Sequence, residues 1–167
     1  IQQIFQSTLP QLIELELWIG TADYGCSDWK ETKEAFQVLF TPEENGCFPL
    51  LQYLRLKNAQ QIDYLLEPVV SSAIVKRIIE LDLSEGCLGD YGAEQLLKLN
   101  DLDTCLRSIN IEHHYITKKT NIDALLNMKI AFLGLFSFGD IDDSYFAEDD
   151  DPDSKLPWMS RYVSVSE

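Results

Sequence analysis

The sequence is poor in positive charge. Its 167 residues contain 13 lysines and arginines against 28 aspartates and glutamates, which gives a formal net charge of −15. Proteins that bind nucleic acid or anionic membranes need clustered basic residues, so neither is an expected partner. The excess of carboxylates favours another protein, basic or neutral, as partner, although an acidic surface can also serve solubility alone.

Cysteine is also scarce and widely spaced. The four cysteines form no C-x-x-C pair, so the sequence predicts no zinc site: Cys26, Cys47, Cys87 and Cys105. A chain of this size can build a core without a disulfide framework. We therefore expect reduced, mostly buried thiols and a cytoplasmic protein, and we expect no cofactor.

No long hydrophobic run is present. The longest apolar stretch, residues 130–138, is far shorter than the roughly 20 residues that span a bilayer. The chain opens on Ile-Gln-Gln-Ile, without an initiator methionine or a basic leader, so the sequence predicts a fragment with no signal peptide. Because 46% of the residues are hydrophobic, a folded domain is expected all the same.

What the sequence does contain is a repeat of the form L-x-x-L-x-x-L-x-L. It occurs at residues 9–17, 48–56 and 75–83, with a broken fourth copy at 106–111 and a weak fifth around Ile130 and Phe132. The corresponding anchors are 39, 27 and 28 residues apart: Leu15, Leu54, Leu81 and Ile109. Each L-x-L predicts a short strand with alternate side chains in the core, and the first interval predicts an insertion.

The third repeat is the most specific. Residues 81–97 read L-D-L-S-E-G-C-L-G-D-Y-G-A-E-Q-L-L, which resembles the ribonuclease-inhibitor-like leucine-rich repeat, L-x-L-S-x-N-x-L-G-D-x-G-A-x-x-L. Nine of the ten specified positions agree, and Gly86 departs where the family has Asn or Cys. The resemblance implies an α/β solenoid of about four to five repeats, with short parallel strands on the concave face and helices on the convex face.

Local signals predict how the helices begin and end. Asp90 is placed to cap the helix of the third repeat, and Gly89 and Gly92 to allow a tight turn out of the strand. Pro68 is expected to break or restart the helix of the second repeat. Asn121 is expected to cap the helix of the fourth.

The composition predicts three regions: a repeat array at 1–139, an acidic segment at 140–157 and a capping strand at 158–167. Eight acidic residues lie between 140 and 153 without the residue order of a calcium-binding loop, so a solvated segment is expected. The final R-Y-V-S-V-S-E suits a strand that covers the end of the array. This ending is similar to that of a group of bacterial cytoplasmic leucine-rich repeat proteins, from which no activity can be carried over.

A leucine-rich array binds through the exposed strand positions of its concave face. The residues between the core leucines are Glu16, Arg55, Asp82 and Asn110, and parallel stacking predicts that they lie side by side. Two further ranks flank them: Glu14, Tyr53, Glu80 and Ser108 on one side, and Trp18, Lys57, Ser84 and Glu112 on the other. From these ranks the predicted partner-binding set is Glu16, Trp18, Tyr53, Arg55, Lys57, Asp82, Asn110 and Glu112. In the alternative interpretation, Glu16, Arg55 and Asp82 only neutralise one another across the strands.

Catalytic and metal sites are not predicted. His113 and His114 are the only histidines, and adjacent strand residues point to opposite faces, so one site could use both only in a loop. His114 falls on the repeat position that favours a structural role, and no nucleophile–histidine pattern or phosphate-binding loop is present. The expected function is noncatalytic protein binding. The alternatives are an acidic inhibitor or immunity protein for a basic partner, and an enzyme that uses His113 or His114.

Overall fold

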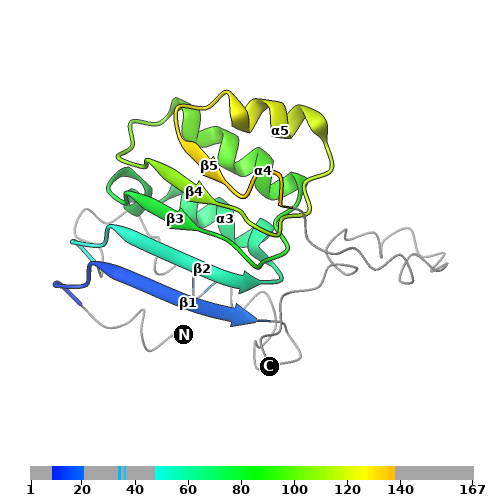
Figure 1. Ribbon diagram of the computed structural model, residues 1–167. Coiled ribbons are helices and arrows are strands. Elements are labelled where there is room, and N and C mark those ends of the chain that lie inside the picture. The colour runs from blue at the N-terminus through cyan, green and yellow to red at the C-terminus, as the bar shows by residue number, and fades with distance from the viewer. Residues whose placement is uncertain (1–8, 21–33, 35, 37–47, 138–167) are drawn as a thin grey trace.

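The computed structural model describes residues 9–20, 34, 36 and 48–137. They form one open sheet of five parallel strands whose spatial order follows the chain, β1-β2-β3-β4-β5. The strands are β1 Glu14–Gly20, β2 Tyr53–Ala59, β3 Glu80–Asp82, β4 Ser108–Asn110 and β5 Ala131–Leu133. Helices α3 Ile62–Ser71, α4 Asp90–Leu97 and α5 Lys119–Leu126 lie on one side of the sheet, with short 3-10 helices at Ala73–Lys76 and Lys98–Asp101 (Figure 1).

The register of the strands follows the repeat of the sequence. Leu15 lies opposite Leu54, which lies opposite Leu81, and the row continues through Ile109 to Phe132. The predicted α/β class and four strand positions are confirmed, and the weak fifth strand also forms. In the described part of the chain, the architecture is therefore a single open sheet of five parallel strands with three α-helices.

Alternate strand side chains and the inner faces of the helices form one hydrophobic cluster. Leu54 and Leu81 from the strands are fully buried, as are Leu66 of α3, Leu96 of α4 and Leu125 of α5. Burying a leucine side chain contributes about 2 kcal/mol. The cluster lies between sheet and helices, which leaves the other side of the sheet uncovered by any described element (Figure 1). We call this uncovered side the open face.

Two helix boundaries differ from the prediction. Helix α3 runs through Pro68 to Ser71, because Leu66, Val69 and Val70 on either side of the proline are buried and hold the last turn against the core. Helix α5 begins at Lys119, so Asn121 lies inside it instead of capping it. Both predictions were wrong, since tertiary packing outweighed the local signals.

The carboxylate of Asp90 also acts differently from the prediction. Gly89 is the N-cap of α4, and no side chain caps this helix. Asp90 Oδ1 instead accepts a hydrogen bond from the backbone N–H of Lys118 at 2.9 Å, at the start of α5. Asp63, one repeat earlier, accepts in the same way from the backbone N–H of Gly89 at 2.7 Å, at the start of α4. Each aspartate thus joins its own helix to the next one.

The predicted role of Gly92 in the turn was also wrong. Gly92 lies inside α4, and a Cβ atom there would collide with Leu88 and with the Asp63 carboxylate, so this glycine allows α3 and α4 to pack closely. A residue with positive φ follows each anchor: Asn58 (53°), Glu85 (62°) and His113 (65°) lie four residues after Leu54, Leu81 and Ile109, and Gly20 (76°) lies five residues after Leu15.

Several predictions lie outside the described residues. They are the acidic segment 140–157, the capping strand 158–167, Cys26, Cys47 and nearly all of the insertion in the first repeat. Of the two described cysteines, Cys87 is buried, whereas Cys105 is exposed and departs from the expectation of buried thiols. In the part of the chain that the structure describes, no helix is long and apolar enough to cross a membrane.

Candidate functional site

The open face presents the exposed strand positions in aligned ranks. Glu16 lies beside Arg55, Arg55 beside Asp82, and Asp82 beside Asn110. Leu133 of β5 completes this rank. Glu14, Tyr53, Glu80 and Ser108 form the neighbouring rank, and Trp18 lies beside Lys57. The predicted juxtaposition of these residues is confirmed, while their role in binding stays a prediction.

Arg55 lies at the centre of an ion-pair cluster on β1–β3. One terminal nitrogen, Nη1, is 3.1 Å from Glu14 and 3.5 Å from Glu16, and Nη2 is 3.5 Å from Glu80. Three carboxylates therefore share one guanidinium, and negative charge remains in excess around it. The Glu14 and Glu16 side chains are 50% and 36% exposed, so this excess faces solvent.

Trp18 is the large aromatic side chain of this cluster. Its indole is 53% exposed, yet Nε1 donates a hydrogen bond to Glu16 Oε1 at 2.7 Å. The Lys57 ammonium lies 5.4 Å from the centre of the ring, at cation–π distance. The hydrogen bond from Trp18 lowers the pKa of Glu16, against the smaller opposing effect of burial, so this carboxylate stays ionised near neutral pH.

Asp82 is more buried than the sequence indicates, whereas Asn110, in the same rank, is of intermediate exposure. Asp82 is only 6% exposed, and its Oδ1 accepts the backbone N–H of Ser84 at 2.9 Å. Asn110 Oδ1 accepts the backbone N–H of Glu112 at 3.1 Å in the same way. Both side chains thus shape the turn that ends their strands.

The alternative interpretation, in which Glu16, Arg55 and Asp82 neutralise one another across the strands, is therefore only partly met. Arg55 pairs with Glu16, whereas the contact of Asp82 is with Lys57, whose Nζ lies 3.8 Å from Oδ2. The remaining predicted residues lie at the edges of this arrangement, with Tyr53 half-buried between Glu14 and Glu80, and Glu112 exposed just after β4.

His114 is engaged by the backbone on both sides of its ring. Its Nδ1 accepts the backbone N–H of Ile116 at 3.1 Å, and its Nε2 donates to the Leu135 carbonyl at 2.8 Å. The side chain is 1% exposed, and burial lowers its pKa. Neither ring nitrogen faces solvent with a free position for a substrate. His113 lies outside this arrangement, with its exposed ring 3.0 Å from Glu85.

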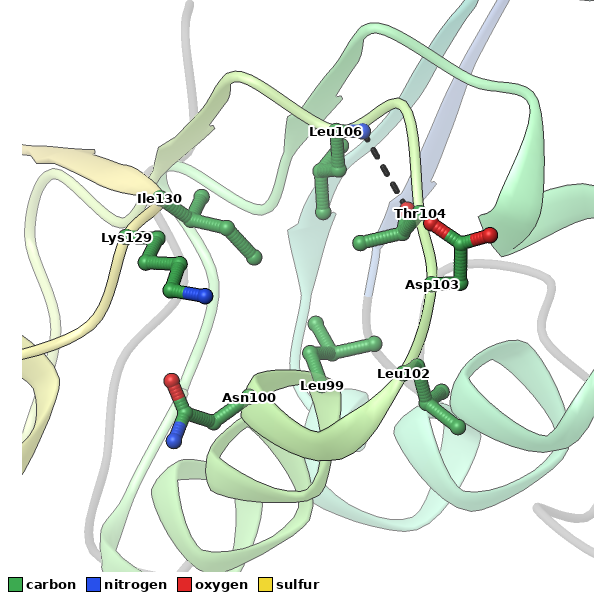
Figure 2. Close-up of a pocket in the computed structure, with 8 residues that line it drawn as sticks. All are labelled: Leu99, Asn100, Leu102, Asp103, Thr104, Leu106, Lys129 and Ile130. Atoms are coloured by element: carbon green, nitrogen blue, oxygen red, sulfur yellow. Dashed lines mark hydrogen bonds between the residues drawn. The ribbon is translucent and has the colours of Figure 1, made fainter.

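A shallow pocket of about 200 Å³ lies away from the open face. The second 3-10 helix, the loop before β4 and the two residues before β5 line it: Leu99, Asn100, Leu102, Asp103, Thr104, Leu106, Lys129 and Ile130 (Figure 2). Figure 2 marks a hydrogen bond from the Leu106 N–H to the Thr104 hydroxyl, which joins two residues of the same loop. No residue of the aligned ranks lines this pocket. Within the described ranges, no group of three His, Cys, Asp or Glu side chains is arranged to hold a metal ion.

Comparisons with known proteins bear on the fold of the chain and not on its function. No model of a known family matches the chain, and no curated protein matches it. The chain is similar to a crystal structure of a Bacteroides fragilis protein from a structural genomics programme, with 26% identity and a TM-score of 0.66 over 83% of this chain. This chain spans 38% of the length of that protein. The shared fold supports a repeat-like arrangement of parallel strands.

Three features of the structure were not predicted from the sequence. They are the helix-joining role of Asp63, the turn-forming hydrogen bonds of Asp82 and Asn110, and the gathering of three carboxylates on Arg55. A signal for the first was present, because Asp63 and Asp90 are 27 residues apart, the same interval that separates Leu54 from Leu81. The turn bonds and the cluster depend on side-chain rotamers, which the repeat pattern does not specify.

Proposed function

We propose that the chain is part of a leucine-rich repeat array and binds another protein through its open face, which is the concave face of such an array. The subclass motif at residues 81–97 supports the repeat assignment, together with the aligned leucine rows and the recurring positive φ after each anchor. The joining of successive helices by Asp63 and Asp90 is a further feature that repeats with the same period.

The observation that most favours binding is the composition of the open face. An exposed tryptophan, held in place by Glu16 and Lys57, shares this face with Arg55, whose side chain is 29% exposed and contacts the same Glu16. Tryptophan, tyrosine and arginine are the residues most enriched at energetic hot spots of interfaces. They lie on strands whose backbone is fixed by pairing, so binding costs little ordering.

A comparison of two double variants, one on each side of the sheet, tests this proposal. Trp18→Ser with Arg55→Gln alters the open face, whereas Glu67→Gln with Asp123→Asn alters exposed positions on helices α3 and α5. Each tagged variant is used to capture proteins from native lysate, and the bound proteins are quantified by mass spectrometry. We expect the open-face variant to lose at least tenfold of a specific partner that the helix-side variant retains. Equal capture by both variants would refute the assignment of binding to this face.

The charge of the chain favours a second, narrower function. An acidic inhibitor or immunity protein neutralises a basic partner, and the net charge of −15 suits that role. This version predicts an association rate that falls steeply as salt rises from 50 to 500 mM, roughly, since screening weakens attraction beyond about 10 Å at 0.1 M. A captured partner whose association rate is independent of salt would leave only the general binding function.

A further inference from the structure

The two ends of the open face differ in chemistry. On β1 and β2 the exposed positions hold Glu14, Glu16, Trp18 and Arg55. At β5 the position in the same rank as Glu16 is Leu133, which is 52% exposed. Phe136, just beyond β5, is 73% exposed. We call these the charged end and the apolar end of the open face.

The charged end has more acceptors than its own cation can satisfy. Arg55 lies 3.1–3.5 Å from three carboxylates, and the contacts to Glu16 and Glu80 are both at 3.5 Å. A carboxylate has about four lone-pair positions, so one guanidinium leaves most of them to solvent. A second cation from outside would gain hydrogen bonds there and would relieve the repulsion among the carboxylates.

Trp18 makes this end suited to a cationic side chain in particular. Its Nε1 hydrogen bond to Glu16 fixes the indole, and Lys57 already lies at cation–π distance from the ring. Glu16 contacts the ring, and Glu14 and Glu16 both contact Arg55 Nη1, so the cluster offers both the stacking surface and the carboxylates that an arginine or lysine uses.

The apolar end lies at a distance that the sheet geometry sets. Strands β1 and β5 are separated by four strand intervals. At about 4.8 Å per interval, Glu16 and Leu133 are roughly 19 Å apart across the sheet. An extended peptide advances about 3.3 Å per residue, so about six residues span that distance.

We infer that the partner presents an extended segment across the strands, with an arginine or lysine at Glu14, Glu16 and Trp18 and an apolar side chain about six residues away at Leu133. This inference rests on the proposed function and names the chemistry of the partner. The apolar side chain gains from burial at Leu133, where two leucine-sized surfaces leave water. The two ends together fix the direction in which the segment lies, because exchanging them would place a cation on Leu133.

The experiment uses a phage-displayed library of random 12-residue peptides, selected on the full chain and then counter-selected on the variant Trp18→Ser with Leu133→Ser, which alters both ends of the open face without changing its charge. We expect the remaining peptides to hold an arginine or lysine five to seven residues from a leucine, isoleucine or phenylalanine. Enriched peptides that depend on the open face but lack this pattern would overturn the inference and leave the proposed function standing. If no enriched peptide depends on the open face, the inference fails, and the lysate comparison decides the proposed function separately.

A second measurement separates the charged end from general attraction to an acidic protein. Fluorescence anisotropy measures the affinity of an enriched, labelled peptide for Glu14→Gln with Glu16→Gln, for Leu133→Ser, and for the control Glu67→Gln with Asp123→Asn. The control also removes two negative charges, but from the helix side of the sheet. We expect at least a tenfold loss for the glutamate pair, a threefold to tenfold loss for Leu133→Ser, and less than a twofold change for the control. An equal loss in the glutamate pair and the control would overturn the inference.

Discussion

Carboxylates on the two sides of the sheet have different partners. On the helix side, Asp63 and Asp90 accept hydrogen bonds from backbone N–H groups at the start of the next helix, at 2.7 and 2.9 Å. On the open face, Glu14 and Glu16 contact the flexible side chain of Arg55 at 3.1 and 3.5 Å. The same chemical group thus meets a fixed donor on one side and a movable one on the other.

The difference separates residues that maintain the fold from residues that are available to a partner. A backbone N–H that loses its acceptor stays where it is and remains unpaired, so its loss costs the desolvation of a buried group. An exposed ion pair loses little when it is broken, because water and salt replace the partner. We therefore expect substitutions on the helix side to change stability and those on the open face to change binding.

The largest effect is expected at Asp63, which is 7% exposed. Asp63→Ala leaves the Gly89 N–H without this acceptor at the start of α4, and we expect a loss of about 2 kcal/mol in the free energy of unfolding. Urea denaturation followed by circular dichroism measures it. Glu67→Ala, on the exposed side of the same helix, should change stability by less than about 0.5 kcal/mol. Equal losses in the two variants would contradict the structural role of Asp63.

Asp90 is expected to contribute somewhat less, because it lies closer to solvent. Asp90→Ala removes the acceptor for the Lys118 N–H and the Thr117 hydroxyl, and we expect a loss of about 1–2 kcal/mol. The control is Glu94→Ala on the same helix, which removes only the exposed ion pair with Lys118. It should cost at most about 0.5 kcal/mol.

The ionisation of Asp90 adds a test by pH. Burial raises the pKa of this carboxyl, but hydrogen bonds from Thr117, Lys118 and Asn121 outweigh burial and lower it below 3.8. A carboxyl with a lowered pKa in the folded state contributes stability above its unfolded pKa and loses it as pH falls towards the folded value. Asp90→Asn should therefore flatten part of the acid limb of the stability curve below about pH 4. An acid limb that is unchanged in this variant would contradict the assignment.

The sequence predicted the strands better than it predicted the hydrogen-bond partners of the polar side chains. The leucine rows predicted four strands and their register, and more weakly a fifth, because a strand that slips by one residue would turn Leu54 or Leu81 to solvent. The sequence did not reveal which side chain each polar residue would bind. Asp90 matched a helix cap by position, yet packing of α4 against α5 placed its carboxylate on the neighbouring repeat.

The candidate site shows the same limit. The ranks of exposed residues could be predicted from the register alone, and Trp18 and Arg55 were named correctly as members of one face. The burial of Asp82 could not be predicted in this way. Strand β3 ends at Asp82, and the Asp82 carboxylate accepts the backbone N–H of Ser84 in the turn that follows. Repeat patterns specify where a side chain starts, whereas rotamers and neighbours decide where it points.

A pH-dependent loss of stability is expected at His114, with a smaller effect at neutral pH than the aspartate substitutions. Burial lowers the pKa of this imidazole below 6.5, and its Nδ1 must be unprotonated to accept the Ile116 N–H. The unfolded chain then binds a proton that the folded chain excludes, so stability is complete above about pH 6.5 and falls as pH decreases below it. His114→Asn should remove this decline, measured by urea denaturation between pH 5 and 8. His113→Asn, at the exposed neighbouring histidine, should retain it, and a decline that persists in His114→Asn would assign it elsewhere.

The smallest effect on stability is expected at Arg55, although this residue has the most ion-pair partners. Arg55→Gln removes the cation from three carboxylates whose side chains are a third to a half exposed, and its buried Nε has no hydrogen-bond partner to lose. We expect a change within about 0.5 kcal/mol at 0.15 M salt, and a larger loss at low salt where the three carboxylates repel one another more strongly. Thermal unfolding of Arg55→Gln and of the unchanged chain, at about 0.15 M and about 0.02 M salt, measures both effects. If Arg55→Gln destabilised the chain as much as Asp63→Ala, the open face would be part of the structural framework, and the separation between the two sides of the sheet would fail.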